Sequence, residues 1–226
     1  MGNQVVDMVR NHKLAMPLSE RLYTLFGDSG IAWDASKALG EIASQDSVLT
    51  KANHADIKKY VGAVLPRLLE FGKDTSVPAR QTAALVSLTS LIKSIPRASY
   101  AHELPSLIPL LLLGLDLPDA DIRSNVIDTF LAAAEGEKPE KSLVSEHSIT
   151  LVNAMLKNSK IAEMPSTDIL QKVRTSALRY LGVLPGIIRY DVLHPYRATV
   201  LRELSTVLDD PKRSVRKEAV DTRTKW

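Results

Sequence analysis

A recurring arginine pattern constrains what this chain can fold into. Each copy has an apolar residue, then arginine, then a small or apolar residue three positions later, and the arginines are Arg80, Arg123, Arg174 and Arg216. They lie 43, 51 and 42 residues apart. Repeats made of antiparallel helices and their turns have a period of about 40 to 47 residues. The spacing therefore predicts a repeated helical hairpin, in which each hairpin buries its apolar face against its neighbours.

The composition favours a helical core without many aromatic rings. Hydrophobic residues make up 45% of the 226 residues, whereas aromatic residues make up 5% and include three Phe. Leu, Ala and Val then have to fill the contacts between helices, as in a stripe of leucines at helical spacing formed by Leu107, Leu110, Leu111 and Leu115. The period and the composition together predict an all-α superhelical solenoid of the HEAT or armadillo type, with about five helical hairpins.

The expected hairpins follow one another in a single continuous domain over residues 1–226. They span residues 14–46, 54–96, 100–136, 139–186 and 189–226. The first hairpin has Trp33 and Asp34 near the place of the arginine pattern, so we interpret it as a degenerate repeat. A longer loop at residues 158–168 accounts for the 51-residue spacing. Prolines such as Pro96 and Pro185 mark expected helix ends, because proline removes a helical hydrogen bond.

A search for catalytic or metal-binding patterns finds none that is specific. The sequence has no cysteine, so it offers neither a thiol nucleophile nor thiolate ligands for zinc or an iron–sulfur cluster. No phosphate-binding glycine loop or nucleophile motif is present. The five histidines lie near expected helix starts without the spacing of metal-ligand pairs; they are His12, His54, His102, His147 and His194. We therefore predict a protein that is not an enzyme and that has no metal site and no cofactor.

We interpret the repeated arginines as structural. An arginine at a fixed place on the second helix of a hairpin can reach acidic residues in its own turn or in the neighbouring turn. Asp74, Asp119 and Asp210 lie six, four and six residues before their arginines. Charge-assisted hydrogen bonds to these residues would hold the register between repeats. The predicted ladder consists of Arg80, Arg123, Arg174, Arg216 and Asp210.

The net charge of +3 is concentrated near the end of the sequence. Residues 189–226 hold nine Lys or Arg and six Asp or Glu, whereas residues 1–188 hold equal numbers of both. Lys212, Arg213 and Lys217, called the basic cluster below, exceed what the repeated pattern requires. We predict that the basic cluster and Arg223 bind a partner; the alternative is a solvated helix start.

The last repeat also carries a family resemblance. Its segments are Leu193–Arg197, Val200–Leu204, Leu208–Arg213 and Val215–Val220, together with Arg223 and Trp226. They closely resemble the carboxy-terminal HEAT repeats of the Mms-nineteen family, the large scaffolds of the cytosolic iron–sulfur assembly targeting complex. Weaker similarity at residues 104–107, 48–56 and 17–19 extends the resemblance to nearly the whole chain. Because the proteins of that family are much longer, the sequence is expected to be a fragment of a longer chain.

The resemblance implies a non-enzymatic adaptor that helps deliver iron–sulfur clusters to apoproteins, including DNA repair helicases and replication polymerases. The implied partners are a small MIP-type assembly protein, its WD-repeat propeller partner, and the recipient apoproteins. The implied location is the cytoplasm and the nucleus. Because the chain has no cysteine, it would hold other proteins and would not carry a cluster through thiolates.

Other classes of protein stay open from the residues alone. One is a nucleic-acid-binding HEAT array that uses the basic cluster, although no aromatic residues interleave with these charges. Another is a generic HEAT scaffold of the nuclear-transport or phosphatase type, which the composition does not distinguish. A membrane protein is not expected, because the longest uncharged apolar run, residues 104–115, is shorter than the about 20 residues of a spanning helix.

Overall fold

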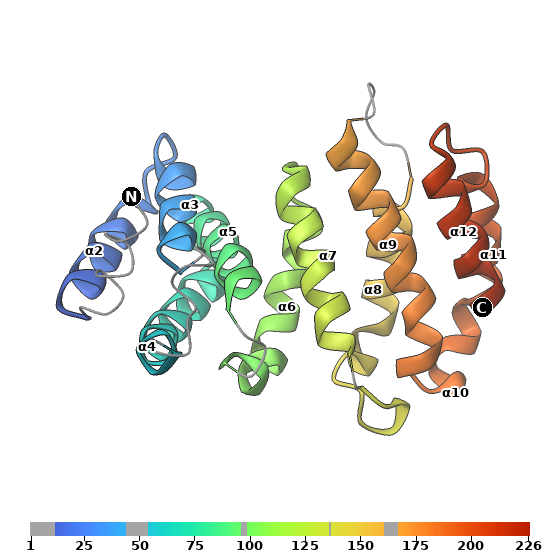
Figure 1. Cartoon of the computed structure of the whole chain (residues 1–226), viewed down its shortest axis with the longest axis horizontal. Helices are drawn as coiled ribbons and strands as arrows, with labels where there is room; N and C mark the ends of the chain where they lie inside the picture. Colours follow the sequence, from blue (N-terminus) through green and yellow to red (C-terminus); the bar gives the residue numbers. More distant parts are fainter. Residues whose placement is uncertain (1–11, 44–53, 96–98, 136, 161–166) are drawn as a thin grey trace. The chain divides into compact units, whose positions relative to one another are not determined.

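The computed structural model describes residues 12–43, 54–95, 99–135, 137–160 and 167–226. Over these ranges the chain consists of α-helices, short 3-10 turns and connecting turns, with no strand (Figure 1). The predicted all-α class is therefore confirmed. Parts of the expected loops, at residues 44–53 and 161–166, lie outside the described residues, as does Pro96. Within the described ranges, none of the helices has the length and apolar character that crossing a membrane requires.

The helices form two compact units, residues 1–111 and 112–226. The division falls within α6 (Leu104–Gly114), so α6 and α7 (Ala120–Ala134), the helices expected for the third hairpin, lie largely in different units. One continuous domain therefore stays a prediction. The expected leucine stripe is buried: Leu107, Leu110, Leu111 and Leu115 are each at most 5% exposed.

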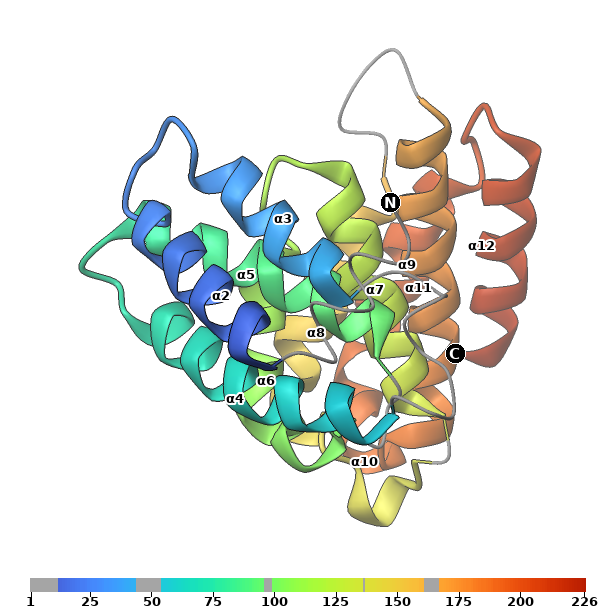
Figure 2. The same cartoon turned by 60° about the vertical axis from the view of Figure 1, so that its left-hand side comes forward.

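Residues 1–111 contain two helical hairpins. The first joins α2 (His12–Leu25) to α3 (Ala32–Ala43), and the second joins α4 (His54–Lys73) to α5 (Pro78–Ser94). Helices α3 and α5 pack side by side (Figure 2). The rings of Tyr23, Phe26 and Phe71 meet edge to face, with centroids 5.4 to 6.2 Å apart. This aromatic cluster joins the two hairpins, because α4 supplies Phe71 and the end of the α2 segment supplies the other rings.

Residues 112–226 contain α7 and five further α-helices: α8 (Ser148–Asn158), α9 (Asp168–Ile187), α10 (Tyr190–Leu193), α11 (Arg197–Val207) and α12 (Arg213–Lys225). Helix α9 is central, because α7, α8 and α12 all pack against it. Figure 1 shows α7, α9 and α12 side by side. Local capping starts two of these helices: Asp119 accepts a hydrogen bond from Ile122 N at 3.0 Å, and Thr167 accepts one from Leu170 N at 3.3 Å.

Helix α9 corrects one sequence-based prediction. Pro185 is expected to end a helix, but α9 continues through it to Ile187. Proline has no N–H, so the carbonyl oxygen of Leu181, four residues earlier, loses its usual helical donor. The indole N–H of Trp226 donates to this oxygen at 2.8 Å. A side chain from the last hairpin thus supplies the missing hydrogen bond, and the helix passes the proline.

Helices α9 and α12 approach each other closely. The hydroxyl of Thr222 donates to the carbonyl oxygen of Leu178 at 2.8 Å. A Cβ added to Gly182 would lie 3.3 Å from this hydroxyl oxygen, closer than ordinary van der Waals contact. Ala219 on the same face of α12 is fully buried. Small residues on both helices therefore let α12 dock firmly, and this docking positions the candidate site.

Candidate protein-binding surface

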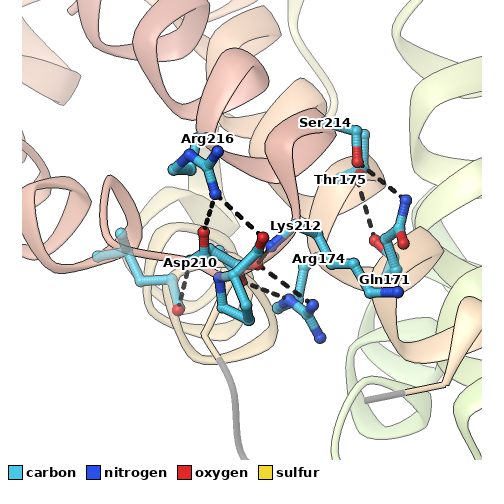
Figure 3. Close-up of polar contacts among 10 residues, drawn as sticks. Gln171, Arg174, Thr175, Asp210, Lys212, Ser214 and Arg216 are labelled. Carbon is cyan, nitrogen blue, oxygen red and sulfur yellow. Dashed lines mark hydrogen bonds and ion pairs between the residues drawn. The ribbon is translucent and has the colours of Figure 1, made fainter.

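A buried ion pair ties the turn between α11 and α12 to α9. Asp210 lies in this turn, and its Oδ2 is 2.8 Å from Nε of Arg174 on α9. The two side chains are 3% (Arg174) and 2% (Asp210) exposed. The main-chain N–H of Lys212 also donates to Oδ1 of Asp210 at 2.8 Å, and Figure 3 shows the carboxylate between these partners. Asp210 therefore links the last hairpin to the preceding one at a place where a charge must be paired.

The side chain of Arg216 holds the same turn by binding main-chain carbonyl oxygens. Nη1 of Arg216 donates to the carbonyl oxygen of Asp210 at 2.6 Å and to that of Pro211 at 3.0 Å (Figure 3). The expected contact was between Arg216 and the Asp210 carboxylate. The structure places the carboxylate on Arg174 instead, because the side chain of Asp210 turns toward α9. Asp210 thus lies between two ladder arginines and uses different oxygens for each.

Arg123, two hairpins before Arg216 in the sequence, makes the same kind of contact. Its Nη1 donates to the carbonyl oxygens of Leu117 at 2.9 Å and Pro118 at 3.0 Å. These residues precede Arg123 by six and five positions, as Asp210 and Pro211 precede Arg216. Asp119, proposed as an ion-pair partner of Arg123, caps the first turn of α7. Arg123 and Arg216 therefore each hold the turn that precedes their own helix, whereas Arg174 contacts the next hairpin.

Arg80 clasps the corresponding turn in the first unit through a carboxylate. Its Nη1 lies 3.7 Å from Oδ2 of Asp74, the partner that the sequence suggests. The guanidinium also lies over the ring of Phe71, 5.7 Å from the centroid. Hydrogen bonds from the hydroxyl and N–H of Ser76, with a smaller contribution from the charge of Arg80, lower the pKa of Asp74. The turn before α5 is thus built around one ionised carboxylate.

Further polar contacts in residues 112–226 join side chains about one repeat apart. The pairs are Lys157–Asp116 at 2.5 Å, Lys172–Asp128 at 2.9 Å, Gln171–Ser214 at 2.9 Å, and Lys160–Glu203. The partners lie 41 to 44 residues apart in the sequence. A hydrogen bond from Lys160, and then its charge, lower the pKa of Glu203. Our sequence reasoning missed these pairs, although polar residues separated by one period were a usable signal.

The basic cluster gathers at the start of α12. Arg213 is the first residue of this helix, Lys217 lies one turn later, and both side chains are exposed. Neither side chain forms an ion pair or hydrogen bond with another residue in the described part of the chain. The first turn of α12 holds no acidic residue. Positive charge at the positive end of the helix dipole is unfavourable by up to about 1 kcal/mol per group.

Arg223 lies in the last turn of α12, at the opposite end of the helix from the basic cluster. Its Nη1 donates to the carbonyl oxygen of Leu201 at 3.0 Å and to the hydroxyl of Ser205 at 2.8 Å. Both acceptors are on α11. The structure thus brings Lys212, Arg213 and Lys217 together and commits Arg223 to a contact within the last hairpin.

Relatives of the chain come from fungi and animals. A protein family described as "RNAPII transcription regulator C-terminal" matches residues 8–185. The chain belongs to the MMS19 family. It is 31% identical over 222 residues to the "DNA repair/transcription protein mms19" of Schizosaccharomyces pombe, covering 96% of this chain and 21% of that protein. It is also 31% identical over 225 residues to the "MMS19 nucleotide excision repair protein homolog" of Mus musculus, covering 97% of this chain and 21% of that protein.

This MMS19-family chain therefore spans about a fifth of the length of the relatives it matches. Its fold is similar to solved repeat structures. An engineered protein gives a TM-score of 0.62 at 16% identity, covering 99% of this chain and 89% of that chain. A designed armadillo repeat protein, solved with the peptide (KR)4, gives 0.59 at 16% identity, covering 98% and 88%. These likenesses concern the fold alone, and they confirm the predicted repeat-solenoid class.

Metal-binding groups are absent from the described residues of this MMS19-family chain, where no three His, Cys, Asp or Glu side chains gather closely enough to hold an ion. His102, His147 and His194 each lie in a 3-10 turn that leads directly into α6, α8 or α11. The side chains of His12 and His54 lie outside the described residues. The described histidines thus occupy equivalent turns before first helices.

Proposed function

We propose that this MMS19-family chain is a non-enzymatic docking module of a larger scaffold. It holds assembly proteins and apoprotein clients for the delivery of iron–sulfur clusters in the cytoplasm and nucleus. The names of its relatives, which refer to DNA repair and transcription, support clients among DNA repair enzymes, and we extend the proposal to replication enzymes. The repeat fold supports docking, because stacked hairpins offer extended surface to other proteins.

The basic cluster carries the proposal. Arg213 and Lys217 add positive charge near a helix end where such charge is unfavourable, and the first turn of the helix holds no acidic residue. The neighbouring cations have structural work, since Arg216 and Arg223 donate to carbonyl oxygens of the same hairpin. An acidic surface on a partner would stabilise the two exposed charges and would speed its association with this hairpin.

The partners that we propose are the small MIP-type assembly protein and the WD-repeat propeller protein bound to it. The chain has no cysteine, so it has no thiolate that could ligate a cluster in transit. Holding a cluster-bearing protein beside a client requires only surface recognition. We expect the acidic surface on the assembly protein.

The test is capture of the purified assembly protein by an R213E/K217E variant. Lys212 is left unchanged, because a new carboxylate at this position would lie in the same turn as the buried Asp210 carboxylate. The matched control is K138E/K141E, which applies the same charge change to two exposed lysines in the turns before α8. We expect roughly tenfold weaker capture by the first variant and unchanged capture by the control. Equal capture by both variants and the parent would contradict the proposed role of the cluster.

Duplex DNA separates the adaptor from the nucleic-acid alternative in the same variants. A docking module for proteins should bind a short duplex weakly at physiological salt, with no difference between parent and R213E/K217E. Tight binding that falls steeply with salt and is abolished by the double reversal would favour nucleic acid as the partner of this surface.

A further inference from the structure

A groove opens at the far end of α12, away from the basic cluster along the helix. It has a volume of about 260 Å³ and lies among the end of α9, the α10 segment and the last residues of the chain. Its apolar lining includes Pro185, Ile188 and Leu193. Ile188 and Leu193 are 1% and 4% exposed, so they form the base of the groove.

Aromatic side chains form the sides of the groove. Tyr190 is 72% exposed, and its ring centroid lies 5.0 Å from that of His194. Trp226 also lines the groove, and two contacts hold it in place. Its indole N–H donates to Leu181, and its main-chain oxygen accepts from Nε of Arg197. Trp226 therefore forms a fixed wall of the groove, because its indole is bonded to Leu181. The exposed ring of Tyr190 forms the other side and can contact a ligand.

The charged residues of the groove are all basic. Arg197 and Lys225 line it together with His194, and no acidic side chain does. Nε of Arg197 already donates to the main-chain oxygen of Trp226. The nearest acidic residue in the sequence, Asp191, is paired with Arg189 at 2.7 Å. The Lys225 side chain forms no ion pair in the described part of the chain and lies over Gly182, with Nζ 3.5 Å from the position of an added Cβ. An anionic group in the groove would meet the ammonium group of Lys225 and the Nη groups of Arg197 beside an apolar surface.

The size of the groove limits what can enter it. Small-molecule sites usually have volumes of about 300 to 1,000 Å³. At about 260 Å³ the groove is smaller than that range, so it accommodates one large side chain and its flanking groups. Charge, apolar lining and size together describe a short peptide segment with an apolar side chain next to a carboxylate.

We propose that this groove docks an acidic segment of a protein partner that presents one large apolar side chain. The apolar side chain packs against Tyr190, Pro185 and Trp226, and a neighbouring carboxylate pairs with Arg197 and Lys225. The inference rests on the proposed docking function but names a second surface, at the opposite end of α12 from the basic cluster. Two contact points on one helix would orient a partner as well as bind it.

The probe is the fluorescein-labelled peptide GSEDLDEGSG, measured by fluorescence anisotropy with the whole chain. One comparison peptide replaces the leucine by glycine, and another replaces the acidic residues by lysine. We expect binding of the first peptide only. Y190A and K225E should each weaken it about fivefold or more, as truncation of a central contact does. The control is K138E, which reverses an exposed charge in a turn before α8, outside both the groove and the basic cluster, and should leave peptide binding within twofold.

Several outcomes would overturn the inference. One is equal affinity for the leucine and glycine peptides, and another is an equal effect of K138E and K225E, which would mean non-specific charge attraction. Preferential binding of a single-stranded thymidine oligonucleotide, lost in Y190A and K225E, would assign the groove to nucleic acid. Loss of partner capture in R213E/K217E without any peptide binding would leave the proposed function intact and end this inference. Peptide binding without capture of the assembly protein would do the reverse.

Discussion

Replacing Arg174 by methionine tests the link between the last two hairpins. The substitution keeps much of the side-chain volume and leaves the Asp210 carboxylate, which is 2% exposed, without its cation. Removal of one partner of a buried ion pair usually destabilises a protein by about 3 to 5 kcal/mol. The N–H of Lys212 still donates to Asp210. We therefore expect the low end of that range, about 3 kcal/mol, which corresponds to a fall in Tm of about 6 to 12 °C.

The assay is urea unfolding followed by tryptophan fluorescence. The chain has two tryptophans, Trp33 in residues 1–111 and Trp226 in residues 112–226. In a W33F background the signal therefore reports the unit that holds Arg174. A matched control is R202M, because the side chain of Arg202 is 74% exposed and its contact with Glu203 is 3.5 Å long. We expect the control to change stability by less than about 0.5 kcal/mol.

A double-mutant cycle with D210N decides whether the pair acts as a unit. D210N alone leaves a buried guanidinium without its carboxylate, so it should also be strongly destabilising. R174M/D210N should be less destabilised than the sum of the single variants by at least about 1 kcal/mol. Additivity within about 0.5 kcal/mol, or an R174M variant as stable as the parent, would refute the assignment of the pair as an inter-hairpin link.

Three other perturbations follow from the same unit. W226F removes the donor to the Leu181 carbonyl and should lower the urea midpoint measured by far-ultraviolet circular dichroism, with a loss of about 1 to 3 kcal/mol, whereas an unchanged midpoint would show that water replaces the indole. The lowered pKa of Glu203 means that its contribution to stability is present above its ordinary pKa of 4.5 and is lost as the pH falls. E203Q should therefore flatten the fall in Tm below pH 4.5, and the same slope of Tm against pH in parent and variant would contradict this. Burial raises the pKa of Tyr180, so its neutral form stabilises the fold until the pH rises above its ordinary value of 10.0; Y180F should reduce alkaline destabilisation, which thermal scans at rising pH would measure.

The helices were largely predictable, because periodic apolar residues and turn signals are local. The arginine pattern also located the turn before each second helix. It did not reveal what the guanidinium contacts. Arg123 and Arg216 donate to carbonyl oxygens, and every residue carries such an oxygen, so the sequence holds no distinctive partner to find. Arg174 differs because its partner, Asp210, lies 36 residues away in the next hairpin.

Pro185 shows how tertiary contacts override a local signal. A proline usually ends a helix, because one carbonyl oxygen is left without a donor. In α9 the donor comes from Trp226, 45 residues from Leu181. The groove beside Pro185 was missed for the same reason, since its lining comes from two distant stretches of the sequence, residues 185–197 and 225–226. The basic cluster was easier to recognise, because its members are neighbours in the sequence.

The basic side chains of residues 189–226 fall into two groups, those that contact oxygens of the fold and those that form no such contact. Arg189 and Arg202 contact adjacent carboxylates, and Arg216 and Arg223 donate to oxygens of the last hairpin. Of the acidic residues, Asp210 is committed to Arg174. Positive side chains that form no ion pair among the described residues therefore lie at the two ends of α12, in the basic cluster and at Lys225 beside the groove. A uniform excess of surface lysine would serve solubility alone, whereas two separate positive sites on one firmly docked helix are suited to a partner with two acidic contacts, whose binding should fall more than additively when both sites are reversed.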